Sequence, residues 1–285
     1  MKLVKTYKDI FKKTLQAIWK RKLLFLIMFV LQLAFLSIFF YIAIIYQIEI
    51  FEDIDGITSP IENLDINEEN LENPDSWQVI MSQYATVNAA YQSLIKNVSL
   101  LGIWTILLYF TFNATLWVSA NFMLSKGWPK KISLKKKLKL LSKSWLKYFV
   151  STLIMLIPFS VVAYYIAVSV IKIAESLLPI SVKILMGIFL ILIYILLVSY
   201  TQLGISSWKN YLKSIVKVAF LRVHYTLLAF LITLLVIILP SFLFYYSTMY
   251  WMNFPVMILS AFLIILMLVV TKVFLVAAGQ GIRKV

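Results

Sequence analysis

The chain has 285 residues, of which 62% are hydrophobic and 14% are charged, and its formal net charge is +15. Soluble domains carry about 25% charged residues, so this composition excludes a water-soluble globular fold and predicts an integral membrane protein. With no cysteine and a single histidine, His224, the chain also lacks the ligands of His/Cys zinc sites and the base of His-activated nucleophiles.

The first apolar stretch, residues 23–46, contains no charged residue. A helix of about 20 apolar residues crosses a bilayer, whereas the apolar region of a cleavable signal peptide has only about 7–15. This stretch therefore predicts a membrane span that stays in the protein. The same criterion predicts five more spans. They cover residues 98–124, 148–171, 182–203, 223–247 and 255–278.

Residues 47–97, between the first two spans, form an insertion that holds ten of the twelve acidic residues. Its first part, residues 51–73, is polar and predicts a loop. Its second part, residues 76–95, has no charge and repeats apolar or aromatic residues every three or four positions, which is typical of one helix face. The end of the first span, a partner protein, a second copy or the outer lipid interface is expected to cover this stripe. The stripe consists of Trp77, Ile80, Tyr84, Val87, Tyr91 and Leu94.

The basic residues gather on one predicted side of the membrane. Eight lie in residues 1–22, nine in 126–147, four in 209–222 and two at positions 283 and 284. With six spans, all these segments share one side and the acidic insertion lies on the other. The positive-inside rule then predicts a multi-pass protein of the cell membrane with cytoplasmic N and C termini.

A basic amphipathic segment precedes each odd-numbered span and ends in an aromatic residue followed, two positions later, by a basic one. The pairs are Trp19 with Arg21, Trp145 with Lys147 and Phe220 with Arg222. We therefore expect an all-α membrane domain of six transmembrane helices, arranged as three hairpins that each follow a basic interfacial helix. The alternative is chance, because any six-span protein has basic cytoplasmic loops. The three repeats would be residues 1–124, with the insertion at about 47–97, residues 125–204 and residues 205–285.

Pro158 and Pro240 lie at corresponding places in the second and third repeats, and a tyrosine pair follows each of them. With the three aromatic-x-basic helix ends, these prolines make the chain resemble the membrane domain associated with glycerophosphoryl diester phosphodiesterases and related multi-span proteins of bacteria and archaea. In that family a separate soluble domain carries out catalysis. No such domain is expected within these residues, so the resemblance implies a membrane module and no phosphodiesterase activity.

The basic segment before the third span is the best-motivated binding site. Each lysine near an anionic leaflet contributes about 1 kcal/mol of attraction, so we expect this segment to bind anionic lipid headgroups on the cytoplasmic side. Nucleic acid is not expected as a partner, because the membrane already accounts for the positive charge. The candidate residues are Lys130, Lys131, Lys135, Lys136, Lys137, Lys139, Lys143 and Lys147.

Polar residues and prolines within the spans are candidates for a transport path. These are Asn113, Asn121, Pro158 and Pro240. An interhelical hydrogen bond is the commoner role of a buried asparagine. Lys272, near the inner end of the last span, is expected to extend its ammonium group to the lipid headgroups.

No catalytic, cofactor or metal site is predicted. The acidic residues of the insertion lack the residue order of an EF-hand, so a solvated loop is favoured over a calcium site. Carboxylates that converged over a pocket would instead indicate an enzyme acting on lipid headgroups. We favour a non-enzymatic membrane component that organises lipid or a partner protein, with a permease for a neutral or lipidic substrate as the alternative.

Overall fold

The computed structural model describes residues 2–62, 74–125, 134–171, 180–205, 207–251 and 254–283. These residues fold into helices and include no strand. Six helical segments within them are long and apolar enough to cross a membrane. The all-α class and the number of apolar spans expected from the sequence are therefore confirmed, as required for a polytopic membrane protein.

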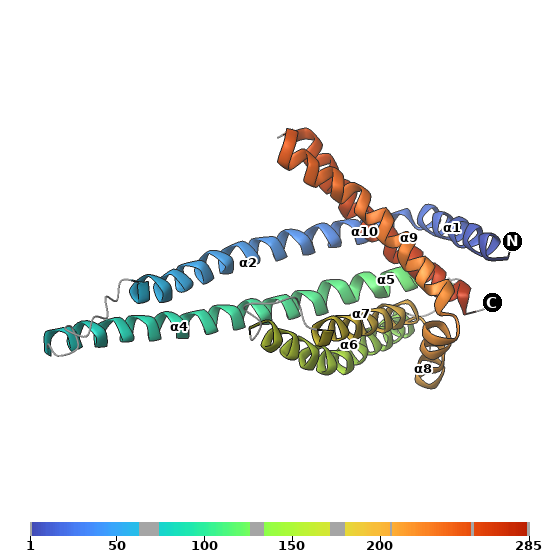
Figure 1. The fold of residues 1–285 in the computed structure, drawn as a ribbon. Helices are drawn as coiled ribbons and strands as arrows, with labels where there is room; N and C mark the ends of the chain where they lie inside the picture. The colour runs from blue at the N-terminus through green and yellow to red at the C-terminus, as the bar shows by residue number, and fades with distance from the viewer. Residues whose placement is uncertain are drawn as a thin grey trace. The chain divides into compact units, whose positions relative to one another are not determined.

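Figure 1 labels the helices in chain order. They are α1 (Lys2–Lys20), α2 (Lys22–Glu62), α4 (Pro74–Leu108), α5 (Ala114–Leu124), α6 (Leu134–Ile171), α7 (Ile180–Thr201), α8 (Trp208–Val216), α9 (Val223–Tyr246) and α10 (Phe254–Ile282). Three π-helical turns interrupt or extend them. These turns are Tyr109–Asn113 between α4 and α5, Lys217–Leu221 before α9, and Ser247–Trp251 after α9.

The chain divides into two compact parts. We call the first the bundle; it comprises Met1–Gln32 and Phe112–Val285. We call the second the long hairpin; it comprises Leu33–Thr111. The bundle therefore contains α1, α5 to α10 and the first residues of α2, whereas the long hairpin pairs the rest of α2 with α4.

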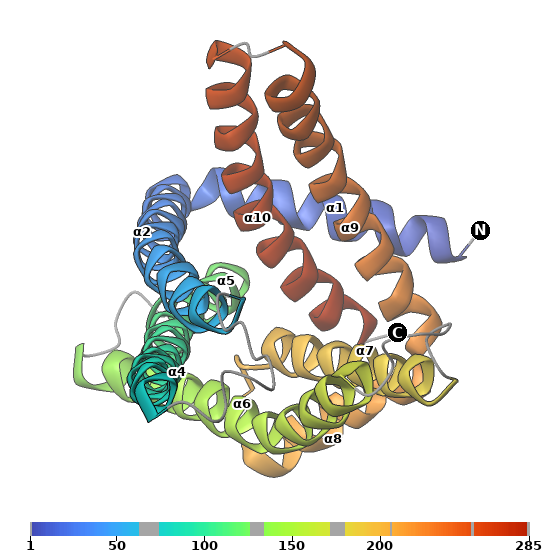
Figure 2. The same ribbon diagram turned by 60° about the vertical axis from the view of Figure 1, so that its left-hand side comes forward.

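Helix α10 is the central element of the bundle, where it packs against α1, α5, α7 and α9. Figure 2 shows α9 and α10 side by side as a hairpin, with α6 and α7 as a second pair. The last part of α10 is almost completely buried, because four helices surround it there. Its buried side chains include Val273, Phe274, Leu275, Val276, Ala277 and Ala278.

Helix α1 packs on α10 with a narrower face than its apolar pattern suggests. Ile10 and Thr14 are buried, and the rings of Phe11 and Phe274 lie 5.0 Å apart. Val4, Leu15 and Trp19 remain exposed. Helix α1 thus has one side in protein contact and keeps a second, apolar side outside the bundle.

The expected loop at residues 51–73 is wrong for residues 51–62, and residues 63–73 lie outside the described part of the chain. Helix α2 continues to Glu62, and two contacts join its second half to α4. The Asn97 amide donates to the Asp53 carboxylate at 2.9 Å, and Gly56 lets the backbone of α2 approach Ala90. Helix α4 begins at Pro74 and runs without a break to Leu108.

The predicted partner stripe on α4 is divided by this pairing. Val87 and Leu94 are half-buried on the same side as Ala90 and Asn97, whereas Tyr84 and Tyr91 are exposed. The side chains of Trp77 and Ile80 lie outside the described part of the structure. The tyrosines of the stripe therefore remain available for a partner, while the two aliphatic residues belong to the side that packs within the hairpin.

Candidate functional site

The C-terminal ends of α5, α7 and α10 meet within the bundle, and a buried asparagine joins two of them. Asn121 of α5 donates to the carbonyl oxygens of Trp117 at 3.0 Å and Tyr200 at 2.8 Å. Its own side-chain oxygen accepts a hydrogen bond from the Gly204 amide at 3.2 Å. The bond to Trp117 lies within α5, and the bonds with Tyr200 and Gly204 couple α5 to the end of α7.

Gln202 extends this polar cluster from α7 to α8. Its amide nitrogen donates to the Thr201 hydroxyl at 2.8 Å, and its oxygen accepts from the Ser214 hydroxyl at 2.9 Å. Both Gln202 and Ser214 are buried. Because buried polar groups without partners are costly, this pairing fixes how the short helix α8 sits against α7.

Three basic side chains, which we call the capping cations, bind carbonyl groups at these helix ends. Arg21 donates to the carbonyls of Phe122 and Ser125, the latter at 3.3 Å. Lys147 donates to the Ile205 carbonyl and Arg222 to the Ile282 carbonyl. The C-terminal end of a helix carries partial negative charge and unpaired carbonyls, so a cation is favoured there.

The capping cations are the basic members of the three aromatic-x-basic pairs in the sequence. Arg21 and Arg222 contact the end of the helix that closes their own predicted repeats, whereas Lys147 contacts Ile205, four positions after α7 ends at Thr201. The sequence pattern located these residues but assigned them no role, because their acceptors lie 58 to 104 positions away along the chain. The only sequence signal for these residues was the basic residue that recurs before each odd-numbered span.

Lys147 is enclosed by protein and serves the fold. It is only 1% exposed, and its ammonium lies 5.8 Å from the centre of the Trp208 ring and 5.4 Å from that of Tyr211. The Tyr211 hydroxyl pairs with Ser151 at 2.7 Å, and burial raises the pKa of Tyr211. A headgroup has no access to this ammonium, so the headgroup hypothesis concerns the other lysines of the segment.

Of the other seven headgroup candidates, the structure describes the side chains of two. Lys139 and Lys143 are exposed on α6. Lys135, Lys136 and Lys137 belong to α6, but their side chains lie outside the described part, as do residues Lys130 and Lys131 altogether. Lys139 and Lys143 are thus the headgroup candidates that the structure places at an accessible surface.

We predict that Lys147→Met lowers the stability of the protein, whereas Lys143→Met, one turn earlier, does not. The methionine cannot donate to the Ile205 carbonyl, and an unsatisfied buried acceptor costs about 1–3 kcal/mol. The exposed substitution should change the free energy of unfolding by less than about 0.5 kcal/mol. Thermal denaturation of the purified variants in detergent measures both. Equal melting temperatures for the two variants would show that the Lys147 contact does not stabilise the bundle.

A polar cavity of about 630 Å³ opens beside these helix ends. Its lining includes Lys13, Asn121, Gln202, Gln280 and Arg283, and none of its lining residues is acidic. Lys13 donates to the side-chain oxygen of Gln280 at 3.2 Å. Arginine and lysine in a site without carboxylates favour an anionic ligand, and the planar guanidinium suits phosphate or carboxylate groups.

The transport-path candidates lie in separate surroundings. Asn113 donates to the Tyr148 hydroxyl at 3.3 Å, and Asn121 lines the polar cavity. Pro240 lines an apolar groove between α9 and α10, and Pro158 is half-buried in α6. The cavities described here therefore do not bring these four residues together, and a path through them stays a prediction.

Lys272 has a partner within the bundle in place of the expected headgroup contact. Its ammonium donates to the side-chain oxygen of Gln32 on α2 at 2.7 Å, and Gln32 is only 3% exposed. Helix α10 continues to Ile282, so Lys272 lies about 15 Å from the helix end at 1.5 Å per residue. That depth explains why the side chain turns toward the neighbouring helix.

Within the described ranges, no group of three or more His, Asp or Glu side chains could hold a metal ion. The acidic residues Asp65, Glu68, Glu69 and Glu72 lie outside those ranges. No family model matches the sequence, and neither a curated protein nor a solved structure matches the chain.

Proposed function

We propose that this protein is a non-enzymatic membrane component that binds anionic lipid headgroups at the basic end of its bundle and thereby organises lipid or a partner protein there. The observation that carries the proposal is the polar cavity at the helix ends, which contains Lys13 and Arg283 and no carboxylate. Its volume of about 630 Å³ falls within the roughly 300–1,000 Å³ of small-molecule sites. A phosphate with its headgroup substituent would fit such a cavity.

The charge around the cavity supports the same function. Basic clusters in residues 1–22, 126–147 and 209–222 precede the odd-numbered spans, and each basic residue near an anionic leaflet contributes about 1 kcal/mol. Exposed Lys139 and Lys143 on α6 belong to one of these clusters. We assign this end to the cytoplasmic leaflet by the positive-inside rule. General attraction would concentrate anionic lipid, and the cavity would then hold individual headgroups.

The test compares two double variants that remove the same charge from different places. Lys13→Gln with Arg283→Gln removes both cations of the cavity, whereas Lys5→Gln with Lys8→Gln removes two exposed lysines of α1. Two lost contacts of about 1 kcal/mol each should weaken binding roughly tenfold or more. We expect this loss for the cavity variant and a smaller one for the control.

Binding is measured as retention of phosphatidylglycerol by the purified full-length chain, with phosphatidylcholine as the neutral reference lipid. Native mass spectrometry counts the lipid that stays bound in detergent. Equal losses in the two double variants would indicate a diffuse electrostatic attraction and no cavity site. Equal retention of the anionic and the neutral lipid by the unaltered protein would contradict the proposal as a whole.

A further inference from the structure

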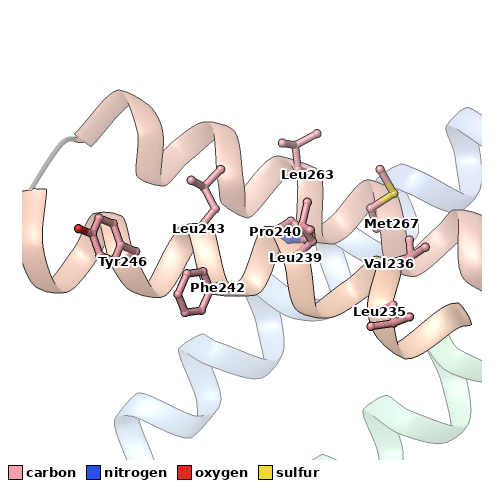
Figure 3. A pocket seen from close by; sticks show the side chains of 9 residues that line it. All are labelled: Leu235, Val236, Leu239, Pro240, Phe242, Leu243, Tyr246, Leu263 and Met267. Atoms are coloured by element: carbon pink, nitrogen blue, oxygen red, sulfur yellow. The ribbon is translucent and has the colours of Figure 1, made fainter. Parts of the chain in front are cut away.

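An apolar groove runs along the outer parts of α9 and α10, at the end of this helix pair away from the polar cavity. The groove has a volume of about 610 Å³, and nine side chains line it (Figure 3). Leu235, Leu239 and Tyr246 contribute from α9, and Leu263 and Met267 contribute from α10. The Tyr246 hydroxyl is the single polar side-chain atom among these nine residues.

The groove lies on the outside of the helix pair. Leu235, Leu239 and Phe242 are all exposed, although they are large and apolar. Both helices are among the six segments that are long and apolar enough to cross a membrane. An apolar groove in such a segment faces hydrocarbon rather than water, and an empty groove would forfeit the dispersion contacts of its lining atoms.

The length and polarity of the groove match one leaflet of a bilayer. Leu235 and Tyr246 are eleven positions apart, or about 16 Å along a helix. This is about half of the ~30 Å hydrocarbon core. Tyr246 is the last residue of α9, and tyrosine is enriched where hydrocarbon meets the headgroup layer. The groove therefore runs from a polar end at the membrane interface to an apolar end near the bilayer centre.

The direction of the groove follows from the other end of the helix pair. Arg222, just before α9, donates to the Ile282 carbonyl at the end of α10. Tyr246, at the opposite end of α9, therefore belongs to the leaflet away from the capping cations. The polar cavity and the groove thus lie toward different leaflets, which makes their ligands independent.

We propose that the groove between α9 and α10 binds one acyl chain of a phospholipid from the leaflet away from the capping cations. The glycerol end of the lipid lies beside Tyr246, and the methyl end lies beside Leu235 and Met267. The gradient from a hydroxyl to pure hydrocarbon favours this occupant, because a phospholipid has its polar end at the membrane interface and its hydrocarbon toward the bilayer centre. The site requires no charge on the lipid, in contrast to the cavity at the helix ends.

The test uses phosphatidylcholine that carries a photoactivatable diazirine near the methyl end of one acyl chain. The full-length chain is reconstituted with this lipid, extracted into mild detergent to strip loosely held lipid, and irradiated. We expect a single label at the apolar end of the groove, within residues 235–239 or 263–267, and none at Tyr246. The exposed residues Ile154 and Ile157 of α6 should stay unlabelled.

Two tryptophan variants of α10 distinguish a lipid bound in the groove from lipid that surrounds the transmembrane surface without a specific site. Leu263→Trp fills the groove and should lower the labelling several-fold. Ile258→Trp places the same side chain at an exposed position that does not line the groove and should leave the labelling unchanged. The label position in the unaltered chain remains decisive even where a variant fails to fold.

Three outcomes would overturn the proposal. The first is the absence of label after the detergent step, and the second is a label spread equally over α6 and the groove. The third is a disulfide-linked dimer of a Leu239→Cys variant under an added oxidant, which would identify a second copy as the occupant, since the natural sequence has no cysteine. Loss of phosphatidylglycerol binding in the cavity variant has no bearing on this result, so the two proposals fail separately.

Discussion

Replacing Gln32 with leucine is expected to destabilise the protein severely, and replacing Lys272 with methionine in the same chain is expected to restore most of the loss. Gln32 is buried and accepts a hydrogen bond from the Lys272 ammonium at 2.7 Å. Residues 23–46 and 255–281 include no Asp or Glu, so no carboxylate on these stretches can replace the amide. Removing the partner of a buried charged group costs about 3–5 kcal/mol.

Substitution of the other partner, Lys272, should cost less stability. Lys272→Met removes the charge itself and leaves a neutral amide with an open acceptor, which costs about 1–3 kcal/mol. The double variant should therefore be more stable than Gln32→Leu alone. Melting temperatures in detergent of both single variants, the double variant and the exposed control Gln47→Leu measure the coupling. Additive effects in the double variant would show that Gln32 and Lys272 act independently.

Gly279→Ala is expected to lower stability, whereas Gly187→Ala is expected to raise it slightly. A Cβ atom at position 279 would lie 2.6 Å from Gln202 Nε2 and 2.8 Å from Thr201 Cβ, whereas one at position 187 would have no neighbour within 4 Å. Overpacking of this kind costs about 1–3 kcal/mol. An unobstructed Gly-to-Ala change within a helix gains about 0.5–1 kcal/mol.

The opposite signs make this pair of variants a direct measurement of the contact between α7 and α10. Both substitutions add one methyl group to a helix of the bundle, so their intrinsic effects on helix propensity are the same. Thermal denaturation of the two proteins under identical conditions gives the comparison. A higher melting temperature for Gly279→Ala than for the unaltered chain would mean that Thr201 and Gln202 move aside at little cost.

The six spans were predictable because hydrocarbon thickness and the cost of burying charge leave few alternatives for long apolar stretches. The start of α4 at Pro74 was also predictable, since proline favours the first turn of a helix. The extension of α2 to Glu62 was not. Acidic and polar residues there gave no helical signal of their own, and the pairing of Asp53 with Asn97 across the hairpin supplies part of what holds them.

The candidate site was predictable in its chemistry and not in its geometry. The sequence indicates a basic membrane side and, by spacing, marks Arg21, Lys147 and Arg222. It does not distinguish the buried Lys147 from the exposed Lys143, because both precede the third span in one lysine-rich segment. The cavity with Lys13 and Arg283 brings together opposite ends of the chain, and no local pattern reports such proximity.

The capping contact of Arg21 has a consequence for where the sequence can take up insertions. In the first predicted repeat, Arg21 reaches the carbonyls of Phe122 and Ser125 although residues 33–111 intervene. The cation and the carbonyls lie just outside the two ends of this segment. The segment can therefore be inserted, shortened or replaced while the contact between Arg21 and the end of α5 is kept. The hairpin is then a region where new sequence could accumulate during evolution while the base of the repeat stays closed.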